Sequence, residues 1–186
     1  MRQWIIAIAL ACVCALSGAF VAKAEDPGVP DTGDATTTDA KPALTPAQVQ
    51  RIIDRYRRVT WHWQRVMGRA VTVRLAQSRS DPVERINMWK RIAIRTARVA
   101  QHPPHARAWQ CIHRYEADWR DPYAPYYGGL QMDLGFQRTY GSYLLARKGT
   151  AENWTPLEQM WVAERAFRAG RGFYPWPNTA RYCGLL

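Results

Sequence analysis

Residues 109–131 have the sequence WQCIHRYEADWRDPYAPYYGGLQ, and this stretch decides how the C-terminal part of the chain is expected to fold. Its first eight residues predict a helix that ends at Glu116. The residues from 121 to 129 are rich in Pro, Gly and Tyr, which predicts a turn region. At most a short β-hairpin is expected, around residues 126–133. The stretch therefore predicts a mainly α fold, or α+β at most.

The remainder of this C-terminal part, taken as residues 105–186, supports the same fold class. Thr155-Pro156 predicts the start of another helix that runs to about Ala169, since threonine caps a helix and proline suits its first position. The 81 residues from Ala106 onward are few for an independent core. They contain five Trp and eight Tyr, so aromatic burial must supply much of the packing.

Residues 45–104 predict a basic helical hairpin. The first helix starts at Thr45-Pro46, and its apolar residues keep helical spacing to about Ser80. The second runs from Asp81-Pro82 to Ala100, and Pro103-Pro104 stops it. Arginines fill the opposite faces. We expect the hairpin to pack on the neighbouring domain; wall binding and pairing with another chain are the alternatives.

The N-terminus indicates export. Residues 1–24 predict a signal peptide, with Arg2, an apolar run from Trp4 to about Leu16, and an A-x-A cleavage pattern at 22–24. The apolar run is short for a membrane span, which needs about 20 residues. We expect soluble secretion and no stable membrane insertion after signal removal; an uncleaved or lipid anchor is the alternative. Residues 25–44, rich in Pro, Gly, Asp and Thr, predict a disordered linker.

The net charge of +11 predicts attraction to anionic polymers, including anionic wall polymers. Composition bias is the plainer explanation, because Arg outnumbers Lys 22 to 4. Nucleic acid is not expected as the partner of an exported chain. Removal of the signal leaves two cysteines, Cys111 and Cys183, which in an exported protein predict one disulfide. No pair of Cys or His has metal-ligand spacing, so neither a metal nor another cofactor is expected.

Four segments occur in an order that resembles the catalytic domain of resuscitation-promoting factors, compact relatives of lysozyme and the soluble lytic transglycosylases. They are WQCIHRYE at 109–116, YYGGLQ at 126–131, Glu158-Gln159 with AERA at 163–166, and Trp176-Pro177 followed by Cys183. The resemblance covers about 75–80 residues from Trp109 onward and leaves out the helical hairpin. It implies a compact lysozyme-like domain that acts on peptidoglycan glycan strands, and with the signal peptide it implies secretion to the bacterial cell wall.

The resemblance implies that Glu116 is the catalytic acid, at the end of a helix that faces a glycan cleft. The acid must stay protonated long enough to donate to the glycosidic oxygen, and apolar or aromatic surroundings favour this by raising a carboxyl pKa. Trp119 is one candidate for such surroundings and for substrate contact. A solvated helix acid is the alternative for Glu116.

The YYGGLQ element supplies the other candidate substrate-binding residues. Gly129 lets the backbone approach a ligand, and Gln131 can hold the acid or a sugar amide in position. Tyr126 and Tyr127 offer a sugar-stacking face, although core packing is the alternative for one of them. Asp133 is the best candidate for a second carboxylate, which glycoside hydrolases need and lytic transglycosylases do not.

The chain departs from the family pattern around its cysteines. The family has its first Cys directly before the catalytic Glu, where this chain has Tyr115, and Cys111 lies one helical turn earlier. Cys183 also lies later than usual after Pro177, so we expect the shifted pair to bond. The resemblance further implies a structural role for Glu164. The four scattered histidines are expected on the surface or in loops.

These features predict an enzyme that cuts the β-1,4 bond between MurNAc and GlcNAc, either as a lytic transglycosylase or as a hydrolase. A peptidoglycan-binding or signalling protein that keeps the fold without catalysis is the alternative. A third hypothesis is a basic structural or membrane-surface protein whose function resides in the hairpin.

Overall fold

A computed structural model describes residues 43–73 and 81–186 of the chain. The predicted signal peptide lies outside these residues. The predicted linker also lies outside them, except for Ala43 and Leu44. Within the described residues, no helix is long and apolar enough to cross a membrane.

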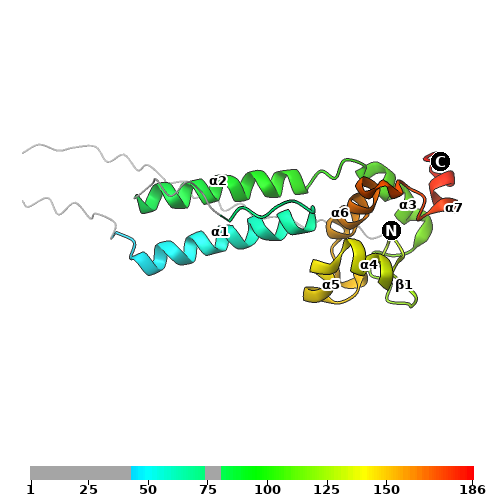
Figure 1. Cartoon of the computed structure of the whole chain (residues 1–186), viewed down its shortest axis with the longest axis horizontal. Helices are drawn as coiled ribbons and strands as arrows, with labels where there is room; N and C mark the ends of the chain where they lie inside the picture. The colour runs from blue at the N-terminus through cyan, green and yellow to red at the C-terminus, as the bar shows by residue number, and fades with distance from the viewer. Residues whose placement is uncertain (1–42, 74–80) are drawn as a thin grey trace, which may run out of the picture. The chain divides into compact units, whose positions relative to one another are not determined.

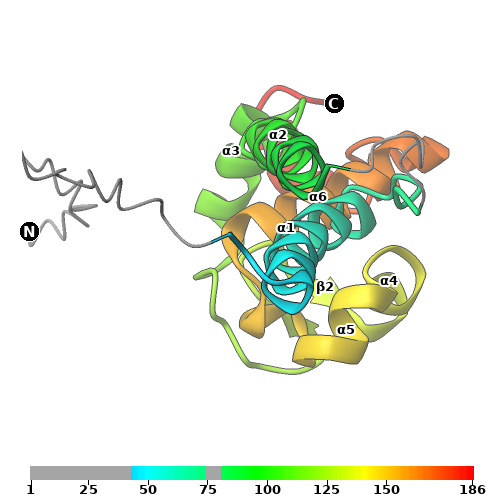
Figure 2. The ribbon, with the colours of Figure 1, turned by 90° about the vertical axis from the view of Figure 1, so that its left-hand side faces the viewer.

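The two hairpin helices start where the sequence predicts. Helix α1 spans Pro46–Val66, and the Thr45 side chain and Gln48 form a capping box at its start. Helix α2 spans Pro82–Ala100, and the Asp81 carboxylate accepts hydrogen bonds from the backbone N–H groups of Val83 and Glu84. The two helices lie side by side (Figures 1 and 2). The threonine and aspartate caps therefore fix both helix starts.

The end of α1 corrects one expectation. The first helix was predicted to reach about Ser80, but it ends at Val66. Gly68 has a φ of +66°, and its N–H donates to Arg65 O while the N–H of Arg69 donates to Gln64 O. A glycine in this left-handed conformation terminates helices because it lacks a Cβ. Residues 69–73 are not helical, and residues 74–80 lie outside the described part of the chain.

The C-terminal part is mainly helical with a two-strand hairpin, which confirms the predicted fold class. The described elements are α3 (Ala106–Glu116), β1 (Tyr126–Tyr127), β2 (Met132–Asp133), α4 (Leu134–Tyr140), α5 (Ser142–Lys148), the 3-10 turn η1 (Ala151–Asn153), α6 (Pro156–Ala166), the π-helical turn η2 (Phe167–Arg171) and α7 (Pro177–Tyr182). β1 and β2 are antiparallel, with Tyr126 opposite Asp133. Helices α4, α5 and α7 were not predicted, and α6 ends three residues before the predicted Ala169.

Helix α6 lies at the centre of the main hydrophobic core. Its Trp161, Val162 and Ala163 are buried, and the core also takes in Val66 and Ala100 from the hairpin helices. The indole Nε1 of Trp161 donates to Ala100 O at 2.8 Å. The hairpin thus packs on the C-terminal part, as expected.

Glu158, on α6, forms a buried ion cluster under α1. Lys148 Nζ lies 2.7 Å and 2.8 Å from its two carboxylate oxygens, and His62 Nε2 lies 3.1 Å from one of them. Burial raises the pKa of Glu158, but the hydrogen bonds with His62, Lys148 and Thr155 together outweigh it. They hold the pKa at about 2, below its ordinary value of 4.5.

The depressed pKa predicts acid lability. Ionised Glu158 stabilises the fold at pH values above its ordinary pKa, and this stabilisation is lost as the pH falls from about 4.5 towards 2. One unit of pKa is worth about 1.4 kcal/mol, so we expect a loss on the order of 3 kcal/mol. Urea unfolding of the wild type and Glu158→Gln, at pH 7 and pH 2.5, measures it. The variant should lose less stability than the wild type over this range; equal losses would contradict the role of Glu158.

Candidate active site

Glu116 is the last residue of α3, and its carboxylate is held by a residue from α7. Ala117 adopts extended backbone angles and ends the helix at this point. The Glu116 side chain is half-buried, and its Oε1 accepts a hydrogen bond of 2.7 Å from Thr179 Oγ1. A short hydroxyl–carboxylate bond fixes the orientation of the carboxyl group. The proposed acid therefore sits in a defined position between two helices.

The same two helices are fastened by a disulfide. Cys111, on α3, is bonded to Cys183 at the end of α7, and their Cα atoms are 6.0 Å apart. The rings of Tyr115 and Tyr182 also meet across the two helices, with centroids 5.8 Å apart. The predicted disulfide is confirmed, and it holds Thr179 within reach of Glu116.

Helix α3 is held on its other side by Glu164. This carboxylate, only 1% exposed, accepts hydrogen bonds from Trp109 Nε1 at 2.8 Å and from the backbone N–H of His105 at 2.7 Å. Its contacts are with the start and the middle of α3. The structural role expected for Glu164 is confirmed.

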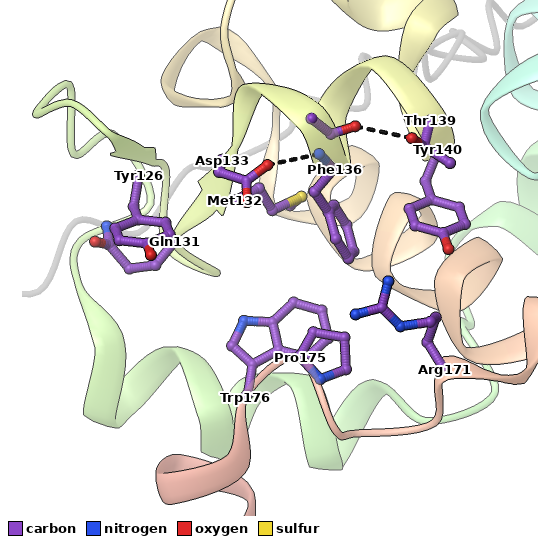
Figure 3. Close-up of a pocket in the computed structure, with 11 residues that line it drawn as sticks. Tyr126, Gln131, Met132, Asp133, Phe136, Thr139, Tyr140, Arg171, Pro175 and Trp176 are labelled. Carbon is purple, nitrogen blue, oxygen red and sulfur yellow. Dashed lines mark hydrogen bonds between the residues drawn. The ribbon is translucent and has the colours of Figure 1, made fainter.

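A pocket of about 390 Å³ opens beside β2 and α4 (Figure 3). Three predicted site residues line it, namely Tyr126, Gln131 and Asp133. The other lining residues are Met132, Gly135, Phe136, Thr139, Tyr140, Arg171, Pro175 and Trp176. Its volume falls in the range usual for small-ligand sites, and its lining combines aromatic rings with a few polar groups.

The pocket is connected to Glu116 through the start of α7. Trp176 lines the pocket, and its Nε1 donates a 2.6 Å hydrogen bond to Leu130 O, directly before Gln131. Three residues later, Thr179 holds Glu116. Glu116 itself is not among the lining residues; its link to the pocket is Thr179, whose hydroxyl group also lies 3.4 Å from the backbone oxygen of Trp176.

Gln131 is held by its own loop and not by Glu116. It has a φ of +47°, a left-handed conformation that is uncommon outside glycine. Its side-chain Nε2 donates to Asp121 Oδ2 at 2.7 Å and to Gly128 O at 3.0 Å. This fixed amide borders the pocket, where it can meet a ligand such as a sugar amide.

Three other predicted substrate residues pack away from this pocket. Trp119 stacks on His113, with ring centroids 3.9 Å apart, and lines a different pocket. Gly129 is buried, and a Cβ atom there would lie 2.5 Å from His113 Nδ1 and 2.9 Å from Trp119 Cα. Tyr127 packs against the main core. Gly129 thus serves close packing between the loop and α3.

Asp133 has a local structural partner. It is the N-cap of α4, and its Oδ1 accepts a 2.7 Å hydrogen bond from the backbone N–H of Phe136. The side chain is exposed and borders the pocket. This contact accounts for Asp133 without a catalytic role, although it leaves the second carboxylate oxygen towards the pocket.

Comparisons with known proteins add nothing to this geometry. No family model, curated protein or solved structure matches the chain. The described residues hold no group of three or more His, Cys, Asp or Glu side chains that is arranged to bind a metal ion. The groups present suit acid–base chemistry, because an oriented, half-buried carboxyl group is linked through Thr179 to the wall of a pocket that also holds a fixed amide and aromatic rings.

Sequence reasoning missed two residues of this region. Thr179 was not singled out because α7 was not predicted, although Pro177 at its first position was a usable signal. Arg171 was not singled out because nothing in the sequence distinguishes it from the other 21 arginines. Two histidines differ from expectation, since His62 and His113 are half-buried on helices, whereas His102 and His105 lie in the non-helical segment before α3, as expected.

Proposed function

We propose that this chain is an exported bacterial cell-wall enzyme that cleaves peptidoglycan glycan strands at the β-1,4 bond between MurNAc and GlcNAc. The observation that carries the proposal is the half-buried Glu116 carboxyl group, oriented by Thr179, which lies three residues after Trp176 in the wall of an aromatic pocket. The resemblance of residues 109–183 to the resuscitation-promoting factor domain supports the same assignment. The Cys111–Cys183 disulfide supports export, since such bonds persist in oxidising compartments.

In the proposed mechanism, Glu116 first donates a proton to the glycosidic oxygen as the bond to the MurNAc C1 atom breaks. The resulting carboxylate then accepts a proton. If the proton comes from the MurNAc C6 hydroxyl, that oxygen bonds to C1 and a 1,6-anhydro end forms. If it comes from water, the product is a reducing end. The capping role of Asp133 favours the first route, which needs one carboxylate.

Mass spectrometry of digested cell wall tests this function. The mature protein, incubated with purified peptidoglycan, should release soluble fragments, and 1,6-anhydro ends would identify transglycosylation. Reducing ends alone would identify hydrolysis. Tight binding to the wall without any released fragments would instead favour the alternative, a peptidoglycan-binding protein with this fold.

The contact between Thr179 and Glu116 predicts a positioning role for the threonine. Thr179→Val removes the hydroxyl at nearly constant volume, so we expect kcat to fall about tenfold while KM changes less than about twofold. Thr179→Ser keeps the donor and should restore most of kcat. Steady-state kinetics with soluble glycan strands measure both. A purely structural role would instead lower the activity and the melting temperature of both variants together.

We further propose that the hairpin attaches the enzyme to an anionic wall polymer. Residues 43–73 and 81–100 carry eleven Lys or Arg and three Asp or Glu. Arg51, Arg55, Arg58 and Arg65 are exposed on α1 at helical spacings of three, four and seven residues. They form one stripe roughly 20 Å long, which suits a linear polyanion.

This attachment predicts salt-sensitive binding. The triple variant Arg51→Gln/Arg55→Gln/Arg58→Gln should bind teichoic-acid-containing wall at least about tenfold more weakly at low salt, because each basic residue contributes roughly 1 kcal/mol at an anionic surface. The difference should shrink as salt rises. A matched control, Arg107→Gln/Arg114→Gln/Arg138→Gln, removes three exposed charges elsewhere. Equal weakening by both triple variants in a wall-pelleting assay would show a general charge effect, and binding only to anionic lipid vesicles would favour a membrane surface.

A further inference from the structure

Arg171 brings an unpaired positive charge into the pocket. It is the last residue of η2, and its guanidinium group points into the space between Tyr140 and Trp176 (Figure 3). Among the described residues, this guanidinium group has no hydrogen-bond or ion-pair partner. Arg168, one turn earlier, donates to Met67 O at 2.6 Å and to Glu164 O at 3.3 Å. Arg168 therefore serves the fold, whereas Arg171 is available to a ligand.

The backbone around Arg171 is shaped to present this side chain. Gly170 has a φ of +87° and Gly172 a φ of +53°, so the chain turns sharply on both sides of Arg171. Both conformations favour glycine. The backbone carbonyl of Arg171 accepts a hydrogen bond from Tyr174 N at 3.2 Å, which closes the turn. The turn directs Arg171 to the pocket, while its glycines make no close contact that would otherwise require them.

The pocket has different chemistry at its two ends. Gln131 and Tyr126 lie at one end, and Arg171 lies at the other with the Tyr140 hydroxyl group (Figure 3). Asp133 is the acidic residue among the lining residues, and one of its oxygens is bound to the backbone of Phe136. A ligand that spans the pocket thus meets an amide at one end and an arginine at the other.

We propose that Arg171, assisted by Tyr140, binds a carboxylate group of the glycan substrate. This inference rests on the proposed peptidoglycan function. Guanidinium groups pair with carboxylates through two parallel hydrogen bonds, and the exposed Arg171 side chain is free to make them at the mouth of the pocket. Peptidoglycan offers two sources of carboxylate next to its sugars. One is the lactyl group of muramic acid when its stem peptide has been removed, and the other is the stem peptide itself.

Calorimetry with a catalytically blocked protein tests the carboxylate subsite without relying on cleavage. Glu116→Gln and Glu116→Gln/Arg171→Gln are titrated with three tetrasaccharides of alternating GlcNAc and MurNAc. One has free lactyl carboxylates, one has lactyl carboxamides, and one carries stem peptides. Loss of Arg171 should raise Kd about tenfold for a carboxylate-bearing ligand and change it less than about twofold for the carboxamide. Weakening of only the first or only the third ligand identifies the source of the carboxylate.

The controls separate this subsite from general charge and from the proposed function. Arg138→Gln removes an exposed arginine of α4 that does not line the pocket, and it should leave every Kd unchanged. Arg171→Lys should give an intermediate Kd, because lysine keeps the positive charge but cannot form two parallel hydrogen bonds with one carboxylate. Equal Kd values with and without Arg171, equal weakening of the carboxamide, or no binding by either protein would overturn the subsite. A wild type that releases no fragments but shows the Arg171-dependent Kd would overturn catalysis alone.

Discussion

Replacing Glu116 with glutamine is expected to abolish most glycan cleavage, with a fall in kcat of about 1,000-fold. General acid catalysis by a positioned side chain contributes about 10² to 10⁴ to a rate, and glutamine cannot donate or accept the proton. The fold should tolerate the change because the amide oxygen of glutamine can still accept the hydrogen bond from Thr179. Release of soluble fragments from purified wall measures the activity, and the melting temperature measures the fold.

Asp133→Asn is the matched control for this experiment. Asparagine caps helices as well as aspartate does, so α4 should keep its start. If Glu116 acts without a second carboxylate, Asp133→Asn should retain activity within about threefold. Full activity in Glu116→Gln would rule out the mechanism. A loss of similar size in Asp133→Asn would indicate a two-carboxylate hydrolase instead.

The double variant Cys111→Ser/Cys183→Ser is expected to lower the free energy of unfolding by about 4 kcal/mol. The bond closes a loop of 72 residues, and the chain-entropy relation gives this magnitude for a loop of that length. The loss is large for a part of the chain that holds so few residues. Activity should fall as well, because the disulfide holds α7, and Thr179 with it, against α3.

Urea unfolding at pH 7 measures the stability of this double variant, and the wild type treated with a thiol reductant should give the same midpoint. Thr179→Val separates the loss of activity from the loss of stability, since it removes the contact with Glu116 but keeps the disulfide. An unfolding free energy within 1 kcal/mol of the wild type would contradict the expected role of the bond.

Three helix starts and the ends of α2 and α3 could be predicted from the sequence, but the end of α1 could not. Thr45-Pro46, Asp81-Pro82 and Thr155-Pro156 each begin a helix as expected, because a capping side chain and a proline act locally. The apolar spacing that runs on through Met67 and Val73 hid the end of α1 at Gly68. Met67 is buried but Val73 is 67% exposed, so the apolar spacing beyond Gly68 marks neither a helix nor a buried segment.

The candidate site shows a similar division. The position of Glu116 at a helix end could be predicted from the motif at residues 109–116. The disulfide could be predicted because an export signal precedes a chain with two remaining cysteines. The Thr179 contact with Glu116 joins residues 63 positions apart, and the Gln131 contact with Asp121 depends on a left-handed backbone residue. Both contacts depend on the tertiary structure, and no local sequence pattern predicts them. Trp119 was predicted to contact substrate, but the fold stacks its ring on His113 instead, and no local pattern in the sequence indicates this contact.

The packing of the hairpin base into the main core has a consequence for anyone who wishes to produce a minimal fragment. A truncation that begins after Pro104 would remove Val66 and Ala100 from the core and leave the Trp161 indole without its acceptor. It would also take His62 away from the buried Glu158. Expression of residues 105–186 alone should therefore give an insoluble or poorly folded product, and the shortest useful fragment begins at Thr45.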